Sequence, residues 1–118
     1  MVTFDKELAA AHHALSRGDD TAAERILKRL LRSAPLHSPA NELMGHVARN
    51  MGDIEGAGRH FRTATISPDA SSNAWYYLGD WFFRHRRLEE AASAFRRAID
   101  VRGAFFEALH ELDRKSVV

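Results

Sequence analysis

The 118-residue sequence is 45% hydrophobic and 28% charged and has only three prolines, which indicates one folded domain and excludes a disordered tail. Its 17 basic and 16 acidic residues give a net charge of +1, so no global field favours nucleic acid or an anionic membrane as the partner. The absence of cysteine excludes disulfides, thiolate zinc sites and thiol nucleophiles, and it is compatible with a reducing compartment.

The first part of the chain predicts a pair of helices. Apolar residues recur at helical spacing from about Phe4 to Arg17, and Gly18 supplies a left-handed end to that helix. Asp19 and the residues after it restart a helix that is apolar on one face and ends before Pro35. This pair is expected to form one helical hairpin.

The middle of the chain predicts a second pair. Ser38 is expected to cap the third helix, with Pro39 in its first turn, where the missing N–H costs nothing. The Gly52-Asp53 turn leads into a fourth helix, from about Ile54 to Ile66. A short linker then follows, residues 69–72.

Three more helices are expected in the last part. The fifth spans about Asn73 to Arg86 and the sixth about Leu88 to Arg102. A seventh is predicted after Gly103, because the segment carries an apolar stripe, formed by Phe105, Phe106, Leu109 and Leu112. No strand pattern, signal peptide or membrane-spanning stretch is expected anywhere in the sequence.

The helices repeat with a period of 34 residues. Small or apolar residues recur at the same offsets in three units, as in Ala23, Ala57 and Ala91, then Leu27, Phe61 and Phe95, then Leu30, Ala64 and Ala98. Gly45 and Gly79 are small where the two helices of a pair must pass close together. Units of this length cannot bury a face alone, so the period predicts a solenoid whose core lies between stacked neighbours.

This pattern resembles the tetratricopeptide repeat family. The third unit matches the family pattern best, with Trp75, Leu78, Gly79, Phe82, Ala91, Phe95 and Ala98. Glu7 and Asn41 depart from it, since each stands where the third unit has Trp75, and Gly103 replaces a terminal proline. The resemblance implies an all-α, right-handed α-solenoid of three helix-turn-helix repeats plus one terminal helix. The whole chain, 1–118, would be a single domain, with repeats at about 4–37, 38–71 and 72–105 and a capping helix at about 104–116.

The resemblance also implies a partner-binding groove. In that family the first helix of each pair faces the concave side and takes peptide segments of other proteins. Carrying the groove offsets over gives candidate residues in all three repeats: His12, Glu42, His46, Arg49, Asn50, Asn73, Tyr76, Tyr77, Asp80, Phe83 and Arg84. Aromatic and polar side chains alternate in this set, which suits side-chain pockets combined with hydrogen bonds to a bound segment.

Histidines in the predicted groove are possible metal ligands. His12 and His46 share one offset in adjacent repeats, and Asp80 has it in the third. Packed helices lie ~8–10 Å apart and metal ligands ~2.0–2.2 Å from the ion, so this ladder is not expected to bind a metal. No cofactor is expected either. Whether His12 and His46 make partner binding depend on pH below about 6.5 is left open.

The predicted function is that of a non-enzymatic protein-protein interaction scaffold. No nucleophile triad, phosphate loop or paired carboxylates appear, so no enzyme is expected. Basic residues alternate with acidic ones on the outer helices, which disfavours nucleic acid as a partner. Two alternatives stay open, an accessory module of a larger enzyme or assembly and a self-associating scaffold that forms homo-oligomers. A cytoplasmic location is expected, and the identity of the protein partner is left open.

Overall fold

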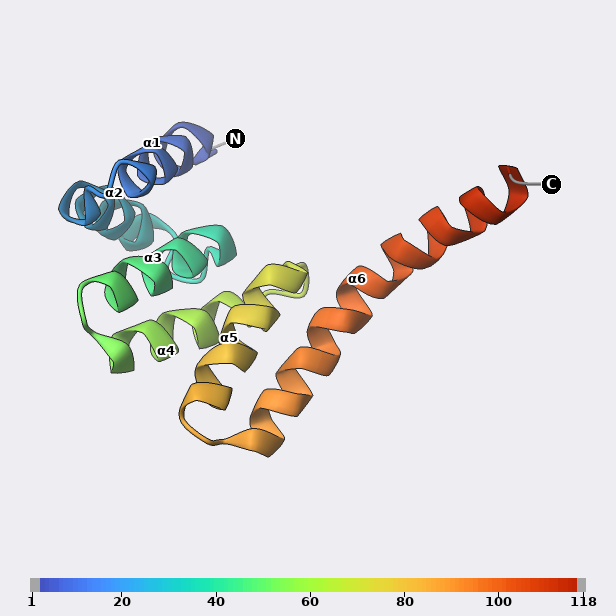
Figure 1. Ribbon diagram of the computed structural model, residues 1–118. Helices are drawn as coiled ribbons and strands as arrows, with labels where there is room; N and C mark the ends of the chain where they lie inside the picture. The colour runs from blue at the N-terminus through green and yellow to red at the C-terminus, as the bar shows by residue number, and fades with distance from the viewer. Residues whose placement is uncertain (1–2, 117–118) are drawn as a thin grey trace. The chain divides into compact units, whose positions relative to one another are not determined.

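The computed structural model describes the backbone of residues 3–116 and the side chains of residues 3–103. Within these limits the chain contains helices and no strand (Figure 1). The helices are α1 (Asp5–Ser16), α2 (Asp20–Ser33), α3 (Ser38–Asn50), α4 (Ile54–Ala64), α5 (Ser72–Arg84) and α6 (Leu88–Ser116). The predicted all-α repeat fold is therefore confirmed for the described residues.

Side-chain caps start four of the helices. Asp19, Asp53 and Ser71 each accept a hydrogen bond from the backbone N–H three residues later. The helix α3 differs from the prediction, because its cap is His37, whose Nδ1 accepts from the N–H of Ala40 at 3.3 Å. Ser38 already belongs to the helix, and its hydroxyl donates to the backbone oxygen of Ala64, which ties α3 to the end of α4.

The turn inside each helical pair needs a left-handed residue. Gly18 and Gly52 fill this position in the first two repeats, with φ of 78° and 84°. The equivalent position in the third repeat is Arg86, with φ of 60°. A side chain in this backbone region costs about 1 kcal/mol, which glycine avoids.

Arg86→Gly is therefore expected to raise the free energy of unfolding by about 0.5–1 kcal/mol, since it relieves a left-handed backbone. Chemical denaturation followed by circular dichroism measures this change. The matched control is Gly52→Arg, which should lower the stability by a similar amount. A loss of stability in Arg86→Gly would show that the arginine side chain contributes more than its backbone costs.

The first compact unit, Met1–Ala70, contains α1 to α4. Both α1 with α2 and α3 with α4 form packed pairs, and α3 also packs against α1 and α2. The core between the first three helices is formed by Ala11, Ala14, Ala23, Leu27, Leu30, Ala40, Leu43, Met44 and Val47. Gly45 allows close packing of α3 on α4, because a Cβ there would lie 2.6 Å from Cδ1 of the buried Phe61.

The second compact unit, Ser71–Val118, contains α5 packed against α6. Gly79 plays the part of Gly45 here, since a Cβ would lie 2.7 Å from ring atoms of Phe95. The buried side chains described for this pair are apolar and belong to Ala74, Leu78, Phe82, Ala91, Ala94 and Ala98. The predicted close approach at both glycines is confirmed.

The predicted break between a sixth and a seventh helix is wrong for the backbone. The helix α6 runs through Gly103 to Ser116 as one helix of 29 residues. Gly103 does not have the positive φ of Gly18 and Gly52, and no proline follows it as Pro35 follows α2. The predicted cap over the end of the core depends on side chains after residue 103, which lie outside the described residues, and it stays a prediction.

Candidate partner-binding surface

Three of the predicted groove residues of the first unit, His46, Arg49 and Asn50, make side-chain contacts within that unit. The guanidinium Nη2 of Arg49 lies 2.9 Å from Nδ1 of His46, and Asn50 donates its amide Nδ2–H to Asp20 at 3.2 Å. His12, Arg49 and Asn50 are exposed, whereas Glu42 and His46 are half-buried. The exposed members therefore present polar groups that a bound segment can reach.

His46 has a structural role besides its place in the predicted groove. Its ring meets Phe61 edge-on, with 5.2 Å between the ring centroids. The pKa of His46 is lowered from 6.5 to about 4, mainly by burial and further by the charges of Arg49 and His12. A neutral ring also lets Nδ1 accept the hydrogen bond from Arg49. A change of partner binding near pH 6.5 would therefore not come from His46, whose pKa is lowered to about 4.

The lowered pKa of His46 predicts a loss of stability in acid. The unfolded chain binds this proton near pH 6.5 and the folded chain only near pH 4. The free energy of unfolding should therefore decrease as the pH is lowered from 6.5 to 4. Allowing for solvent screening of a half-buried group, the loss is on the order of 1 kcal/mol. Melting temperatures of wild type and His46→Gln at pH 7 and pH 4.5 test this. A variant as acid-sensitive as the wild type would contradict it.

The second unit presents three residues on α5 that we call the α5 wall: the half-buried Asp80 and the exposed Phe83 and Arg84. Nε of Arg84 lies 2.9 Å from Oδ2 of Asp80, one turn away on the same helix. The side chain of Arg84 is 72% exposed and Phe83 is 58% exposed. An exposed phenyl ring beside an oriented ion pair is a combination typical of binding surfaces.

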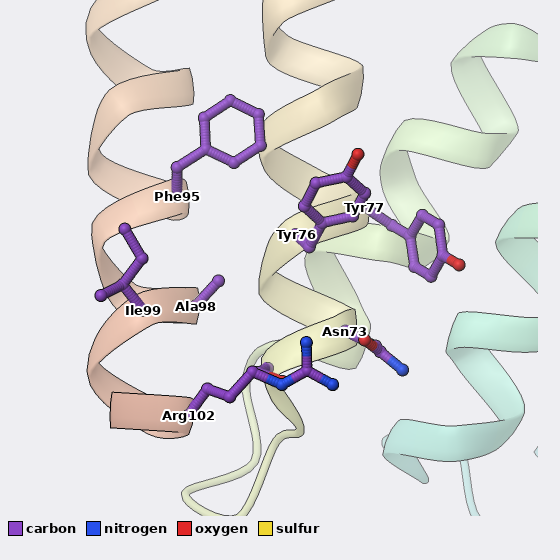
Figure 2. Close-up of a pocket in the computed structure, with 8 residues that line it drawn as sticks. Asn73, Tyr76, Tyr77, Phe95, Ala98, Ile99 and Arg102 are labelled. Atoms are coloured by element: carbon purple, nitrogen blue, oxygen red, sulfur yellow. The ribbon is translucent and has the colours of Figure 1, made fainter. Parts of the chain in front are cut away.

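Three other predicted residues of α5 share a hollow with residues of α6 instead. Asn73, Tyr76 and Tyr77 line a hollow of about 500 Å³ between the two helices, which we call the α5–α6 hollow (Figure 2). Its other lining residues are Ser72, Phe95, Ala98, Ile99 and Arg102. The Tyr76 ring packs against Tyr77 and Phe95, with centroid distances of 5.5 and 5.7 Å. Most of this lining is apolar.

The four α6 residues of the hollow were not predicted as site residues. The sequence did contain a signal for them, because Phe95, Ala98 and Ile99 stand two periods after Leu27, Leu30 and Leu31. Those leucines belong to the buried or half-buried core of the first unit. Apolar residues at the same offsets in the last repeat therefore indicate a surface that needs a cover.

The described residues show three further features that bear on function. No three histidines, aspartates or glutamates among them lie close enough to hold a metal ion. No described helix is long and apolar enough to cross a membrane. Several basic side chains make local contacts, such as Arg87 with Glu90 at 2.6 Å, Lys28 with Glu24 at 3.6 Å and Arg97 over the Trp75 ring at 5.0 Å. These pairs agree with a solvated outer surface of mixed charge.

A comparison with family models decides the classification. The model described as tetratricopeptide repeat matches residues 42–105, more than half of the chain. The chain belongs to the tetratricopeptide repeat (TPR) family. The resemblance found in the sequence is thus confirmed, and with it the general role of TPR repeats as scaffolds for interactions between proteins.

Solved structures with TPR folds match most of the chain. A mutant of the O-GlcNAc transferase of Thermobaculum terrenum has a TM-score of 0.75 and 27% identity over 87% of this chain and 21% of the transferase chain. Two structures of MamA have TM-scores of 0.68 and 0.71 and identities of 22% and 21%. They cover 86% and 92% of this chain and 60% and 59% of the MamA chains. The chain therefore spans about a fifth of the transferase and about three-fifths of MamA. No curated protein matches the sequence.

Proposed function

We propose that this TPR chain is a non-enzymatic scaffold that binds a peptide segment of a partner protein in its groove, with the α5 wall as the main contact. The observation that carries the proposal is the exposed phenyl ring of Phe83 beside the Arg84–Asp80 pair. Truncation of a well-packed aromatic or arginine side chain often costs ~2 kcal/mol or more of binding energy. Both kinds of side chain are reachable here.

The chemistry of the wall favours a peptide with an apolar and an acidic side chain. Phe83 offers apolar area that is now in contact with water. The half-buried carboxylate of Asp80 orients the guanidinium of Arg84. An arginine can in turn bind a carboxylate of another molecule in bidentate geometry.

Photo-crosslinking tests the proposal and does not require that the partner be identified beforehand. A benzophenone analogue of phenylalanine at position 83 should crosslink to a partner when the full chain is expressed in its native cell. Mass spectrometry of the adduct then identifies the bound peptide. The control is the same analogue at Val101, which is exposed on α6 and lies outside both the wall and the hollow. Equal adducts at both positions, or none at position 83, would contradict binding at the wall.

The transferase match favours a second candidate function, that of an accessory repeat module in a larger enzyme. The matched region is only 21% of that transferase chain, so TPR repeats of this kind occur within larger proteins. An immunoblot of the native cell separates the two cases. A species near 13.3 kDa supports the independent scaffold, and a much larger species supports the module. The cytoplasmic location remains a prediction.

A further inference from the structure

The α5–α6 hollow resembles the site on the first two helices where α3 packs. In the first unit the equivalent residues Leu27 and Leu30 are 0% and 2% exposed, because α3 packs over them. In the second unit their equivalents Phe95 and Ala98 are half-buried and 9% exposed, whereas Ile99, the equivalent of the half-buried Leu31, is 67% exposed and lines the open hollow. The repeat places apolar side chains at the same offsets in both units, so the hollow is expected to accept a helix as the first unit accepts α3.

The helix α1 of another copy does not fit the α5–α6 hollow. The side chains that α3 contributes to the core are Ala40, Leu43, Met44 and Val47. The residues one period earlier on α1 are Lys6, Ala9, Ala10 and His13, all exposed and none of them large and apolar. Head-to-tail stacking of copies through α1 would therefore bury two polar side chains and little apolar area.

The helix α6 carries the seam that a helical partner needs. Residues at alternating spacings of three and four follow one line along it: Leu88, Ala91, Phe95, Ala98, Arg102, Phe105, Leu109 and Leu112. This average period of 3.5 is typical of helix packing on another helix. Within the described side chains, Ala91 and Ala98 are buried in the pair with α5. Figure 1 shows the backbone of α6 continuing past the end of α5.

The later part of the seam cannot reach the hollow of its own chain. In a continuous helix Leu109 lies ten residues beyond Ile99, which corresponds to about 15 Å at ~1.5 Å per residue. We propose that residues 104–116 of α6 from a second copy dock in the α5–α6 hollow, and that the second copy receives the same segment in return. The antiparallel pair of α6 helices is an isologous dimer interface, in which each hollow meets the other seam.

Charge and apolar area both favour a second copy as the occupant. Arg102 stands at the rim of the hollow, and Glu107 and Glu111 flank the apolar residues of the docking segment. Phe105, Leu109 and Leu112 follow the i, i+4, i+7 pattern of an amphipathic helix that lies in an apolar groove. This inference goes beyond the proposed function, because it concerns the hollow and leaves Phe83 and Arg84 free for another protein.

Disulfide trapping tests the exchange directly, because the natural chain has no cysteine. Single variants Ile99→Cys and Leu109→Cys are mixed and oxidised as full chains. We expect a reducible dimer at twice 13.3 kDa, and at least tenfold less of it when Val101→Cys replaces Ile99→Cys. The double variant should also form dimers. An intramolecular disulfide in the double variant, with no dimer from the mixture, would overturn the proposal, because the segment would then fold back on its own chain.

Light scattering gives an independent measurement of the same claim. Across a dilution series the wild type should show the mass of two chains at high concentration. Ile99→Asp should shift it to one chain with unchanged helicity, whereas Val101→Asp should leave the dimer intact. A wild type that stays at 13.3 kDa throughout would overturn the proposal, whichever other protein the hollow binds.

Discussion

Gly45→Ala is expected to lower the free energy of unfolding by about 2 kcal/mol, although alanine is the better helix former. The new Cβ would lie 2.6 Å from Cδ1 of Phe61, whose ring is 2% exposed and has no room to withdraw. The substitution therefore pushes α3 away from α4 or forces the ring off its rotamer. Denaturant titration with intrinsic tryptophan fluorescence and circular dichroism measures the change.

The same substitution elsewhere in the chain supplies the control. Gly103 lies inside α6, and a Cβ there meets nothing within 4 Å. Gly103→Ala should therefore gain about 0.5–1 kcal/mol from helix propensity alone. If both variants were stabilised, α3 and α4 would not approach each other closely at Gly45, and the packing described for this pair would be wrong.

Asn41→Leu is expected to cost about 2–4 kcal/mol, the largest effect of any polar substitution that we predict. Asn41 is 2% exposed, and its amide Nδ2 donates to the backbone oxygens of Pro35 at 2.9 Å and His37 at 3.0 Å. Its Oδ1 accepts from Nδ1 of His60 at 3.1 Å. A leucine of similar volume would leave the oxygen of Pro35 and Nδ1 of His60 without this partner, whereas the oxygen of His37 would keep the backbone N–H of residue 41.

Asn50→Leu is the matched control, since Asn50 is exposed and has one side-chain hydrogen bond, to Asp20. Its effect should stay within about 0.5 kcal/mol, as for ordinary surface changes. Thermal unfolding of both variants by calorimetry measures the difference. A wild-type melting temperature for Asn41→Leu would show that the buried hydrogen bonds contribute nothing net to folding.

Much of the fold could be predicted because the same residue pattern occurs in three repeats. The Gly18 and Gly52 turns, the close approach at Gly45 and Gly79 and the aspartate caps each follow from local rules at equivalent offsets. Asn41 shows the limit of this reasoning. The sequence marks it only as a departure from the aromatic residue of the pattern, and its role appears once the loop before α3 and the α4 residue His60 are seen around it.

The errors have physical causes of a different kind. Ser38 is a favoured cap residue, but the preceding His37 has an extended backbone and an acceptor nitrogen, which moves the helix start by one position. Gly103 ends a helix only with a left-handed backbone, which nothing after it enforces. For the site, the spacing of residues on α5 alone could not show which of them belong to the α5 wall and which to the α5–α6 hollow. The hollow is defined by the residues of α6 that line it together with α5.

A titration of the peptide identified by crosslinking at position 83 tests the central claim of partner binding most directly. Phe83→Ala and Arg84→Ala should each raise the dissociation constant at least tenfold, a loss of about 1.4 kcal/mol of binding free energy, with unchanged helicity. Arg25→Ala and Arg29→Ala, on the outer helix α2, should leave the affinity unchanged. If the α2 variants instead abolish binding and the α5 variants do not, the α5 wall is not the binding site and the account is wrong.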